Sequence, residues 1–391
     1  MGKRIADVDA LRGFALLGIF VVNITFMASG FTNALVPDPN HQHWYDDVAH
    51  FASYIFVDTK FYLLFSFLFG YSLTLLAGPS PQLPRAKILR RLVGLMVLGI
   101  AHMVLLYTGD ILFTYGLFGL LLLAMWKLSP RAAVIVGIAI TLLMGGSAIL
   151  AGLLAPAPPP GDPEAALRAT ELLQGGFGDV IAAHLHLLPV QVIVIVAQGP
   201  LCLATFLFGM AAGRRRLLET TTEAVWRRVQ VIGFPVGLAG ALVFAIGGGS
   251  LGTNPVTAGI SLLTAPFLTA AYVATLMRMF AAGSRLRAVL APAGRMALTN
   301  YLTQSLVGVV LFTGIGFGLV GELSTPALLA VAVLVFGAQL PLSRWWLTRF
   351  RYGPVEWLLR AFTNLEVPQW RSPAEPARDV EPEPVGRSDP A

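Results

Sequence analysis

Four polar side chains stand inside long apolar stretches of this 391-residue sequence: Asn23, Lys60, His102 and Asp110. On insertion scales an ionisable group in such a stretch costs about 2.5–3.5 kcal/mol, so these positions are candidates for function. Histidine is the natural general base near neutral pH, and Asp110 follows His102 by eight residues. Their similar depth predicts one polar site, with Lys60 paired to Asp58 or Asp110. The structural alternatives are an interhelical hydrogen bond, a salt bridge and a satisfied core histidine.

A second polar group lies towards the other end of the apolar stretches. Asp9 and Arg12 are i,i+3 neighbours at the start of the first stretch. They form either an anchoring ion pair or the entry site for an anionic cofactor. Arg295 precedes a later stretch, in which Asn300 and Gln304 lie one turn apart on one face. We predict that these five residues bind the cofactor.

Membrane-spanning helices must position these residues. Hydrophobic residues make up 56% of the chain and charged residues only 12%, against about 25% charged in a soluble domain. One span needs roughly 20 mostly apolar residues. About ten stretches qualify: 12–30, 51–77, 91–108, 110–126, 132–154, 189–212, 229–248, 256–277, 297–320 and 325–343. The sequence therefore predicts an all-α, polytopic membrane helix bundle in a lipid bilayer, with a tight hairpin between the third and fourth spans.

The distribution of positive charge predicts the orientation. With both termini cytoplasmic, 24 of the 27 Lys and Arg residues lie on the inner side and one, Arg168, lies outside. The remaining two, Arg12 and Lys60, stand within spans or at their edges. Positive charge accumulates on the cytoplasmic side of membrane proteins, so we expect a multi-pass protein of the plasma (inner) membrane. The net charge of +6 then reflects topology and lipid head groups, and we expect no nucleic-acid partner.

The chain divides into four regions: a membrane half over 1–154, an outer loop over 155–188, a second membrane half over 189–364 and a disordered tail over 365–391. Within the outer loop, Asp162-Pro163-Glu164 predicts the start of a short helix over 163–173. Residues 178–188 are amphipathic and are expected in the membrane interface. Gln198-Gly199-Pro200 is expected to interrupt the sixth span.

Several kinds of site are excluded or disfavoured. The one cysteine, Cys202, rules out a disulfide framework or a thiolate metal site. The pairs His41-x-His43 and His184-x-His186 lack carboxylates at a defined spacing, so we expect no metal. The absence of a Walker loop and of a Gly-x-Ser-x-Gly elbow argues against an ATP-driven pump and a serine hydrolase.

Five strings occur in order between about residues 5 and 364. They are DALRGFALLGIFVVN (9–23), KFYLLFSFLFG (60–70), His102 followed by GDIL (109–112), GRMALTNY (294–301) and GPVEW (353–357). In these strings the chain resembles the YeiB family of bacterial inner-membrane proteins, whose C-terminal half is a domain of unknown function.

Residues 9–70 also resemble the transmembrane acyltransferase superfamily, which includes heparan-alpha-glucosaminide N-acetyltransferase. The shared features are Asp-x-x-Arg-Gly at 9–13, Asn23, and His41 three residues before Trp44. The resemblance implies transfer of an acyl group from a cytoplasmic donor, such as acyl-CoA, to a small-molecule or cell-envelope acceptor.

In such an enzyme either His102 or His41 is the base and Asp110 orients it. Asn23 or Lys60 stabilises the oxyanion, while Arg12 and Arg295 bind donor phosphates. The alternatives are a transporter of a small molecule, in which the same polar residues form a substrate or proton path, and a structural or signalling membrane protein. The oligomeric state stays open.

Overall fold

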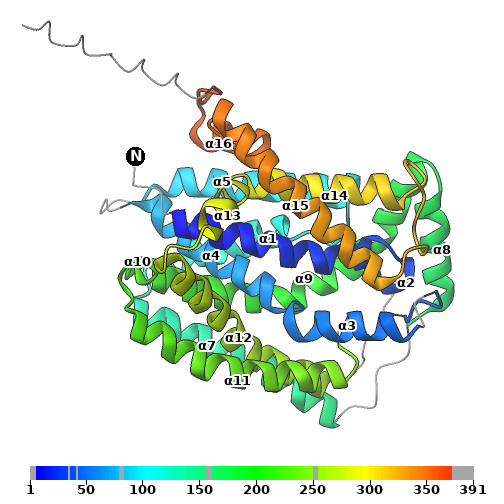
Figure 1. The fold of residues 1–391 in the computed structure, drawn as a ribbon, viewed down its shortest axis with the longest axis horizontal. Coiled ribbons are helices and arrows are strands. Elements are labelled where there is room, and N and C mark those ends of the chain that lie inside the picture. Colours follow the sequence, from blue (N-terminus) through cyan, green and yellow to red (C-terminus); the bar gives the residue numbers. More distant parts are fainter. Residues whose placement is uncertain are drawn as a thin grey trace, which may run out of the picture.

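The chain folds into long helices that run side by side, as a computed structural model shows (Figure 1). The structure describes residues 6–33, 36–40, 43–78, 83–154, 161–249 and 254–371. Helices are expected because an apolar environment offers no partner for backbone groups, which must bond within the segment. The described helices are α1 (Ala6–Met27), α2 (Gly30–Asn33), α3 (Trp44–Phe56), α4 (Lys60–Ala77), α5 (Arg85–Leu105), α6 (Leu112–Ala124), α7 (Pro130–Leu154), α8 (Pro163–Gln174), α9 (Phe177–Arg214), α10 (Leu217–Thr220), α11 (Glu223–Ile246), α12 (Pro255–Ala281), α13 (Leu286–Arg295), α14 (Ala297–Phe312), α15 (Thr325–Arg349) and α16 (Pro354–Asn364).

The predicted fold class is confirmed. Within the described residues, eight helical segments are long and apolar enough to cross a membrane, with α3 and α4 taken together as one segment. The shorter apolar helices α6 and α14 match the fourth and ninth expected spans. The predicted hairpin is also present, because only residues 106–111 separate α5 from α6. The chain is an integral membrane protein with an all-α helix bundle.

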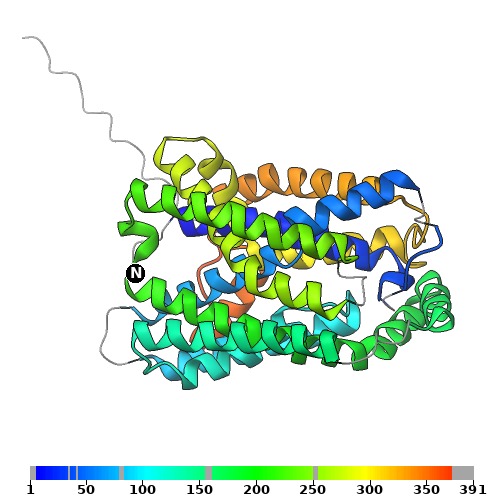
Figure 2. The same cartoon turned by 90° about the horizontal axis from the view of Figure 1, so that it is seen from below.

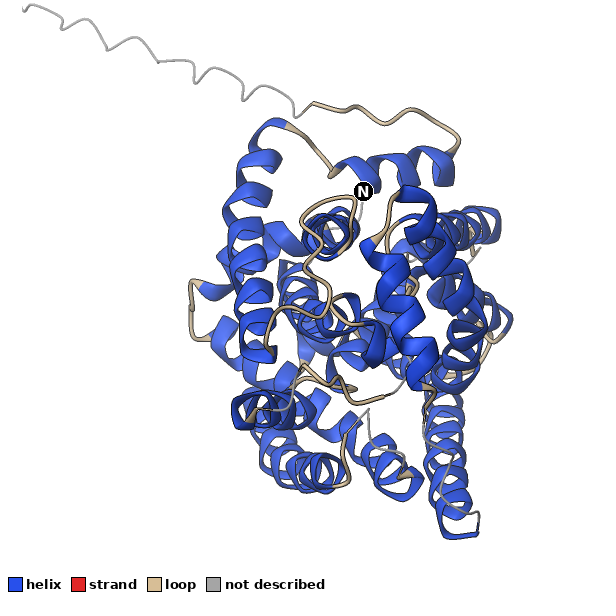
Figure 3. Ribbon diagram, turned by 90° about the vertical axis from the view of Figure 1, so that its right-hand side faces the viewer, coloured by secondary structure: helices blue, strands red, loops and turns tan. Residues whose placement is uncertain are grey.

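The two ends of the bundle differ. We call the end at which α1 begins the Arg12 end, and the opposite end, where α8 packs against α2 and α9, the α8 end (Figure 1). Figure 2 shows the long helices running from one end to the other, and Figure 3 views them from the α8 end. The predicted short helix is confirmed as α8, whose N-cap Asp162 accepts a hydrogen bond from the Glu164 amide at 2.9 Å.

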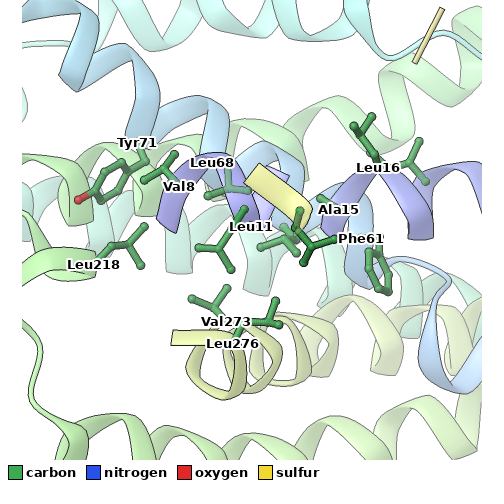
Figure 4. Packing of buried hydrophobic residues seen from close by; sticks show 14 of the residues in the cluster. Val8, Leu11, Ala15, Leu16, Phe61, Leu68, Tyr71, Leu218, Val273 and Leu276 are labelled. Atoms are coloured by element: carbon green, nitrogen blue, oxygen red, sulfur yellow. The ribbon is translucent and has the colours of Figure 1, made fainter. Parts of the chain in front are cut away.

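Helix α1 lies at the centre of the bundle. Its residues Val8, Leu11 and Ala15 recur at helical spacing and are fully buried. They pack with side chains of α4 and α12, among them Phe61 and Leu276 (Figure 4). On another side α1 meets α13 so closely that a Cβ at Gly13 or Gly294 would overlap the backbone of the partner helix. This close approach brings the Arg12 and Arg295 backbones near each other, since each adjoins one of these glycines.

Two expectations about single segments are wrong. The expected span 51–77 consists of two helices. The helical conformation is interrupted between Phe56 and Lys60, where Thr59 has a φ of 69°. Conversely, α9 runs unbroken through Gln198-Gly199-Pro200. Opening a turn at Pro200 would leave backbone groups unpaired in an apolar setting, and prolines within spanning helices are tolerated when the helix continues around them.

The segment after α16 also differs from the expected tail over 365–391. Its first part folds back, with the Arg351 amide donating to the Trp370 carbonyl at 3.1 Å and Trp357 Nε1 donating to the Pro368 carbonyl at 2.8 Å. Trp370 packs against Trp346 and Phe350 at ring-centroid distances of 6.1 and 5.3 Å. Aromatic burial thus holds this segment in place. Residues 372–391 lie outside the described part of the chain.

Candidate functional site

A carboxylate, an imidazole and a hydroxyl form a line in the middle of the bundle. His102 Nδ1 lies 2.9 Å from Asp110 Oδ1, and both side chains are fully buried. On the other side of the ring, His102 Nε2 lies 2.8 Å from Ser305 Oγ. Within the described chain, neither Nδ1 nor Oδ1 makes a hydrogen bond of normal geometry, so the 2.9 Å contact joins two buried polar atoms that have no other partner. The sequence brought His102 and Asp110 into one candidate site but gave no sign of Ser305.

The hairpin between α5 and α6 places the first two residues. His102 stands one turn before the end of α5, and the chain reverses through residues 106–111. Asp110 Oδ2 then accepts a hydrogen bond of 2.6 Å from the Phe113 amide in the first turn of α6. The two carboxyl oxygens of Asp110 therefore have different partners: Oδ2 caps α6, and Oδ1 contacts His102.

The position of the ring hydrogen decides what these three groups can do. If the hydrogen of the imidazole lies on Nδ1, it points towards the Asp110 carboxyl group. Nε2 is then the acceptor, and the Ser305 hydroxyl donates to it. In this arrangement the imidazole can act as a general base and remove the proton of the hydroxyl, while the carboxyl group holds the ring in position.

A large cavity occupies the Arg12 end, with a volume of about 1410 Å³. Its wall is strongly basic. The basic lining residues are Arg12, Arg85, Lys87, Arg91, Lys127, Arg214, Arg216, Arg295 and Arg360, and the acidic ones are Asp9, Glu219 and Glu356. The cavity extends inwards to Ile111 and Tyr301, and the Tyr301 ring packs on His102 at a centroid distance of 5.0 Å. Its inner wall therefore adjoins the His102 site.

A second, much smaller pocket of about 20 Å³ lies towards the α8 end. It is lined by Met27, Tyr107, Thr108, His184 and Gly308, among others. Tyr107 stands edge-on to His102 at a centroid distance of 6.2 Å. His102 thus lies between a tyrosine that lines the large cavity and one that lines the small pocket.

The predicted cofactor-binding residues separate into two sets. Asp9, Arg12 and Arg295 all line the large cavity. Arg12 Nη1 is 2.7 Å from Asp9 Oδ1, and Nη2 donates to Ser72 Oγ. Asn300 and Gln304 do not line this cavity and instead bond to Ser343 and Gln339 of α15.

The other predicted catalytic residues are not brought to His102. Lys60 is buried, and its Nζ donates to the Tyr54 carbonyl at 2.6 Å, whereas both oxygens of Asp110 are used by His102 and Phe113. Asn23 is partly exposed and lines neither cavity. His41 lies outside the described residues. The described residues hold no group of three or more His, Cys, Asp or Glu that could bind a metal ion.

Glu356 of α16 supports the helix that carries Ser305. Its Oε1 accepts hydrogen bonds from the Leu298 and Thr299 amides at 2.6 and 3.1 Å, and its Oε2 accepts from Thr299 Oγ1 at 2.5 Å. It therefore caps the N-terminus of α14 from a distant part of the chain. Burial raises the pKa of the Glu356 carboxyl, while these hydrogen bonds act in the opposite direction. The strings GRMALTNY and GPVEW meet at this contact.

Comparison with known proteins identifies the family. Residues 212–366 match a family model described as "Protein of unknown function (DUF418)". The uncharacterized protein YxaH of Bacillus subtilis (strain 168) is 28% identical across 93% of this chain and 95% of its own length. The uncharacterized protein YeiB of Escherichia coli (strain K12) is 31% identical across 92% of this chain and 96% of its own length. With this similarity over nearly its whole length, the chain belongs to the YeiB family.

Proposed function

We propose that this membrane protein is an acyltransferase that carries an acyl group from a donor at the Arg12 end to an acceptor at the α8 end. The observation that carries the proposal is the buried line Asp110–His102–Ser305, set between a large basic cavity and a small pocket on opposite sides. His102 is the base that takes the proton of an attacking hydroxyl or amine. Asp110 positions His102 through Nδ1.

The large cavity suits a donor with an anionic, phosphate-bearing head, and we propose acyl-CoA. A cavity of about 1410 Å³ exceeds the roughly 300–1,000 Å³ of ordinary small-molecule pockets. Arginine binds phosphate by paired hydrogen bonds, and Arg12 and Arg295 both line this cavity, each next to a glycine of the α1–α13 contact. The acyl end of such a donor would point to Tyr301 and His102.

The Arg12 end is the cytoplasmic end in this proposal, and the membrane is the plasma membrane. Of the 27 Lys and Arg residues, the large majority lie near helix ends on that side, as positive charge does in cytoplasmic loops. A cytoplasmic cavity has access to the acyl-CoA pool. The acceptor would then approach from the outer face, at the water-sized pocket lined by Thr108 and His184, which would have to widen to admit it.

A transporter is the second candidate, because a cavity on one side and a closed barrier on the other is also the layout of an inward-open carrier. The two proposals differ in what happens to the donor. An acyltransferase cleaves the thioester, whereas a transporter releases its substrate unchanged.

The test uses purified full-length protein in lipid nanodiscs. We expect acetyl-CoA to bind by calorimetry, and label from [¹⁴C]acetyl-CoA to move to a component of a cell-envelope extract. Arg12→Gln and Arg295→Gln should each weaken acetyl-CoA binding by about 10- to 100-fold, since a hydrogen bond to a charged group contributes about 1.5–3 kcal/mol. Arg131→Gln is the matched control, because Arg131 is exposed and lies outside the cavity. Absence of acetyl-CoA binding to the wild type would overturn the proposal.

A further inference from the structure

The Ser305 hydroxyl differs from its neighbours on the same helix. Thr303 and Thr313 direct their hydroxyls to the carbonyl four residues earlier, each at 2.8 Å. This local bond is the usual choice for a hydroxyl within a helix. For Ser305 the corresponding distance to the Tyr301 carbonyl is 3.4 Å, while His102 Nε2 lies at 2.8 Å. The shorter contact is the one to the imidazole, and it places Ser305 Oγ within hydrogen-bond distance of the proposed base.

The position of Ser305 along α14 places it between the two cavities. Tyr301, one turn earlier, lines the large cavity, and Gly308 and Val309, one turn later, line the small pocket. At 1.5 Å per residue, each level is about 6 Å from Ser305 along the helix axis. Ser305 itself lines neither cavity, so a thioester entering from one end and an acceptor entering from the other would each have to move about one helical turn beyond its cavity to reach the hydroxyl.

We propose that Ser305 is the nucleophile, and that the acyl group crosses the barrier as an ester on Ser305 Oγ. This inference rests on the proposed acyl transfer. An ester on Ser305 divides the transfer between the two cavities into two shorter steps, and His102 is the base in each of them. The donor and acceptor then need not occupy the protein together.

Both steps balance. In the first, Ser305 Oγ attacks the thioester carbonyl, and its proton passes to His102 Nε2. The carbon–sulfur bond breaks, the leaving thiolate takes the proton from His102, and free CoA departs. In the second, an acceptor hydroxyl or amine attacks the ester and gives its proton to His102. The bond to Oγ breaks, and Oγ recovers the proton.

A donor for the developing oxyanion is also at hand. The Tyr301 hydroxyl is buried beside Asp110 and the Ile111 amide, yet it makes no hydrogen bond of normal geometry within the described chain. Its ring packs on His102 and borders the large cavity. A preorganised donor of this kind stabilises the tetrahedral intermediate.

The decisive experiment needs no acceptor. Purified protein in nanodiscs is mixed with acetyl-CoA and isotopically labelled free CoA, and exchange of the acetyl group between them is followed. An acyl-serine route predicts exchange, together with one acetyl group on the peptide that contains Ser305. Ser305→Ala should lower exchange at least about 10²-fold, within the range of base-catalysed steps, with acetyl-CoA affinity changed less than about 2-fold.

Two variants keep the result interpretable. Ser305→Cys retains a nucleophile and should carry the acetyl group as a thioester that neutral hydroxylamine removes. Thr303→Ala is the matched control on the exposed side of the same helix and should exchange normally. Acetyl-CoA binding and transfer without exchange, or exchange by Ser305→Ala, would overturn the serine route and leave the acyltransferase proposal standing. A wild type that does not bind acetyl-CoA would overturn both.

Discussion

The two buried faces of α14 use polar residues in opposite ways. Towards α15, Gln304 Nε2 donates to Gln339 Oε1 at 2.9 Å, and Gln339 Nε2 donates to the Asn300 carbonyl at 3.0 Å. Asn300 Nδ2 also donates to Ser343 Oγ at 3.0 Å. This face, which we call the amide face, contains uncharged amides and hydroxyls that bond to one another and hold two helices together.

The other face carries Tyr301 and Ser305 and meets His102. Here an imidazole lies between a carboxyl group and a hydroxyl, in place of the amide network, and the helix lines a cavity one turn before and one turn after Ser305. We call it the histidine face. The polar residues of α14 therefore fall into two classes, those of the amide face and those of the histidine face. Even adjacent residues, such as Gln304 and Ser305, belong to different classes. What distinguishes them is the partner side chain and whether a residue of the same face, such as Tyr301, lines a cavity.

The largest expected effect is on the histidine face. His102→Gln keeps a hydrogen-bonding side chain of similar size but cannot move a proton between two partners. We expect turnover to fall by about 10²–10⁴-fold, with acetyl-CoA affinity nearly unchanged. Isotope exchange and calorimetry on the same nanodisc preparation measure both. Unchanged exchange by this variant would remove the histidine face from the chemistry.

The next effect concerns Asp110, which acts through His102 and is therefore a positioning residue. Asp110→Asn keeps the shape but places an amide where the carboxylate accepted, so the imidazole loses its fixed hydrogen position. We expect the turnover number to fall by about 10²-fold or more while the KM for acetyl-CoA stays within about 2-fold. A purely structural carboxylate would instead give a less stable protein with normal turnover per folded molecule.

The amide face should respond in stability and not in rate. Gln304→Leu leaves Gln339 Oε1 without the amide that donates to it and should cost about 1–3 kcal/mol of unfolding free energy. The double variant Gln304→Leu with Gln339→Leu removes both polar groups and should recover most of that loss. Thermal melting in detergent measures the cost, and exchange should remain within about 2-fold. A large loss of exchange by folded double variant would contradict the division between the two faces.

The smallest effect is expected at Glu356, which caps α14 and so supports both faces. Glu356→Ala should cost about 1 kcal/mol, as loss of a helix cap does, and Glu356→Gln should cost less because it keeps one acceptor oxygen. The raised pKa of the Glu356 carboxyl also predicts that the stability of the folded protein depends on pH. A raised carboxyl pKa means that the folded state holds its proton more tightly than the unfolded state does. The resulting stability is complete below the ordinary carboxyl range and declines as pH rises through the raised pKa.

Glu356→Gln should abolish this part of the pH dependence of the melting temperature. Its matched control is Glu366→Gln, a carboxyl on the exposed segment after α16. An identical pH profile for wild type and Glu356→Gln would show that the cap does not titrate in this way.

Some features of the site were accessible from the sequence because they are local. His102 and Asp110 are eight residues apart, so a helix end and a short turn are enough to bring them together. Asp9 and Arg12 share a helix face for the same reason. Asn300 and Gln304 were also predicted to share a face, and they do, but the sequence could not say whether that face meets a cavity or α15.

The apolar stretches determined the fold class, because a chain that cannot bond its backbone to solvent must form helices of about 20 residues. Positive charge near their ends predicts the orientation. Ser305 was decided only by the tertiary structure, since 203 residues separate it from His102. The hydroxyl of a serine in an apolar helix ordinarily donates to a carbonyl of the same helix, so the presence of a serine there does not indicate a functional site. Its contact with His102 depends on how α14 packs against α5, with Glu356 capping α14, and such long-range packing is not written in any local pattern.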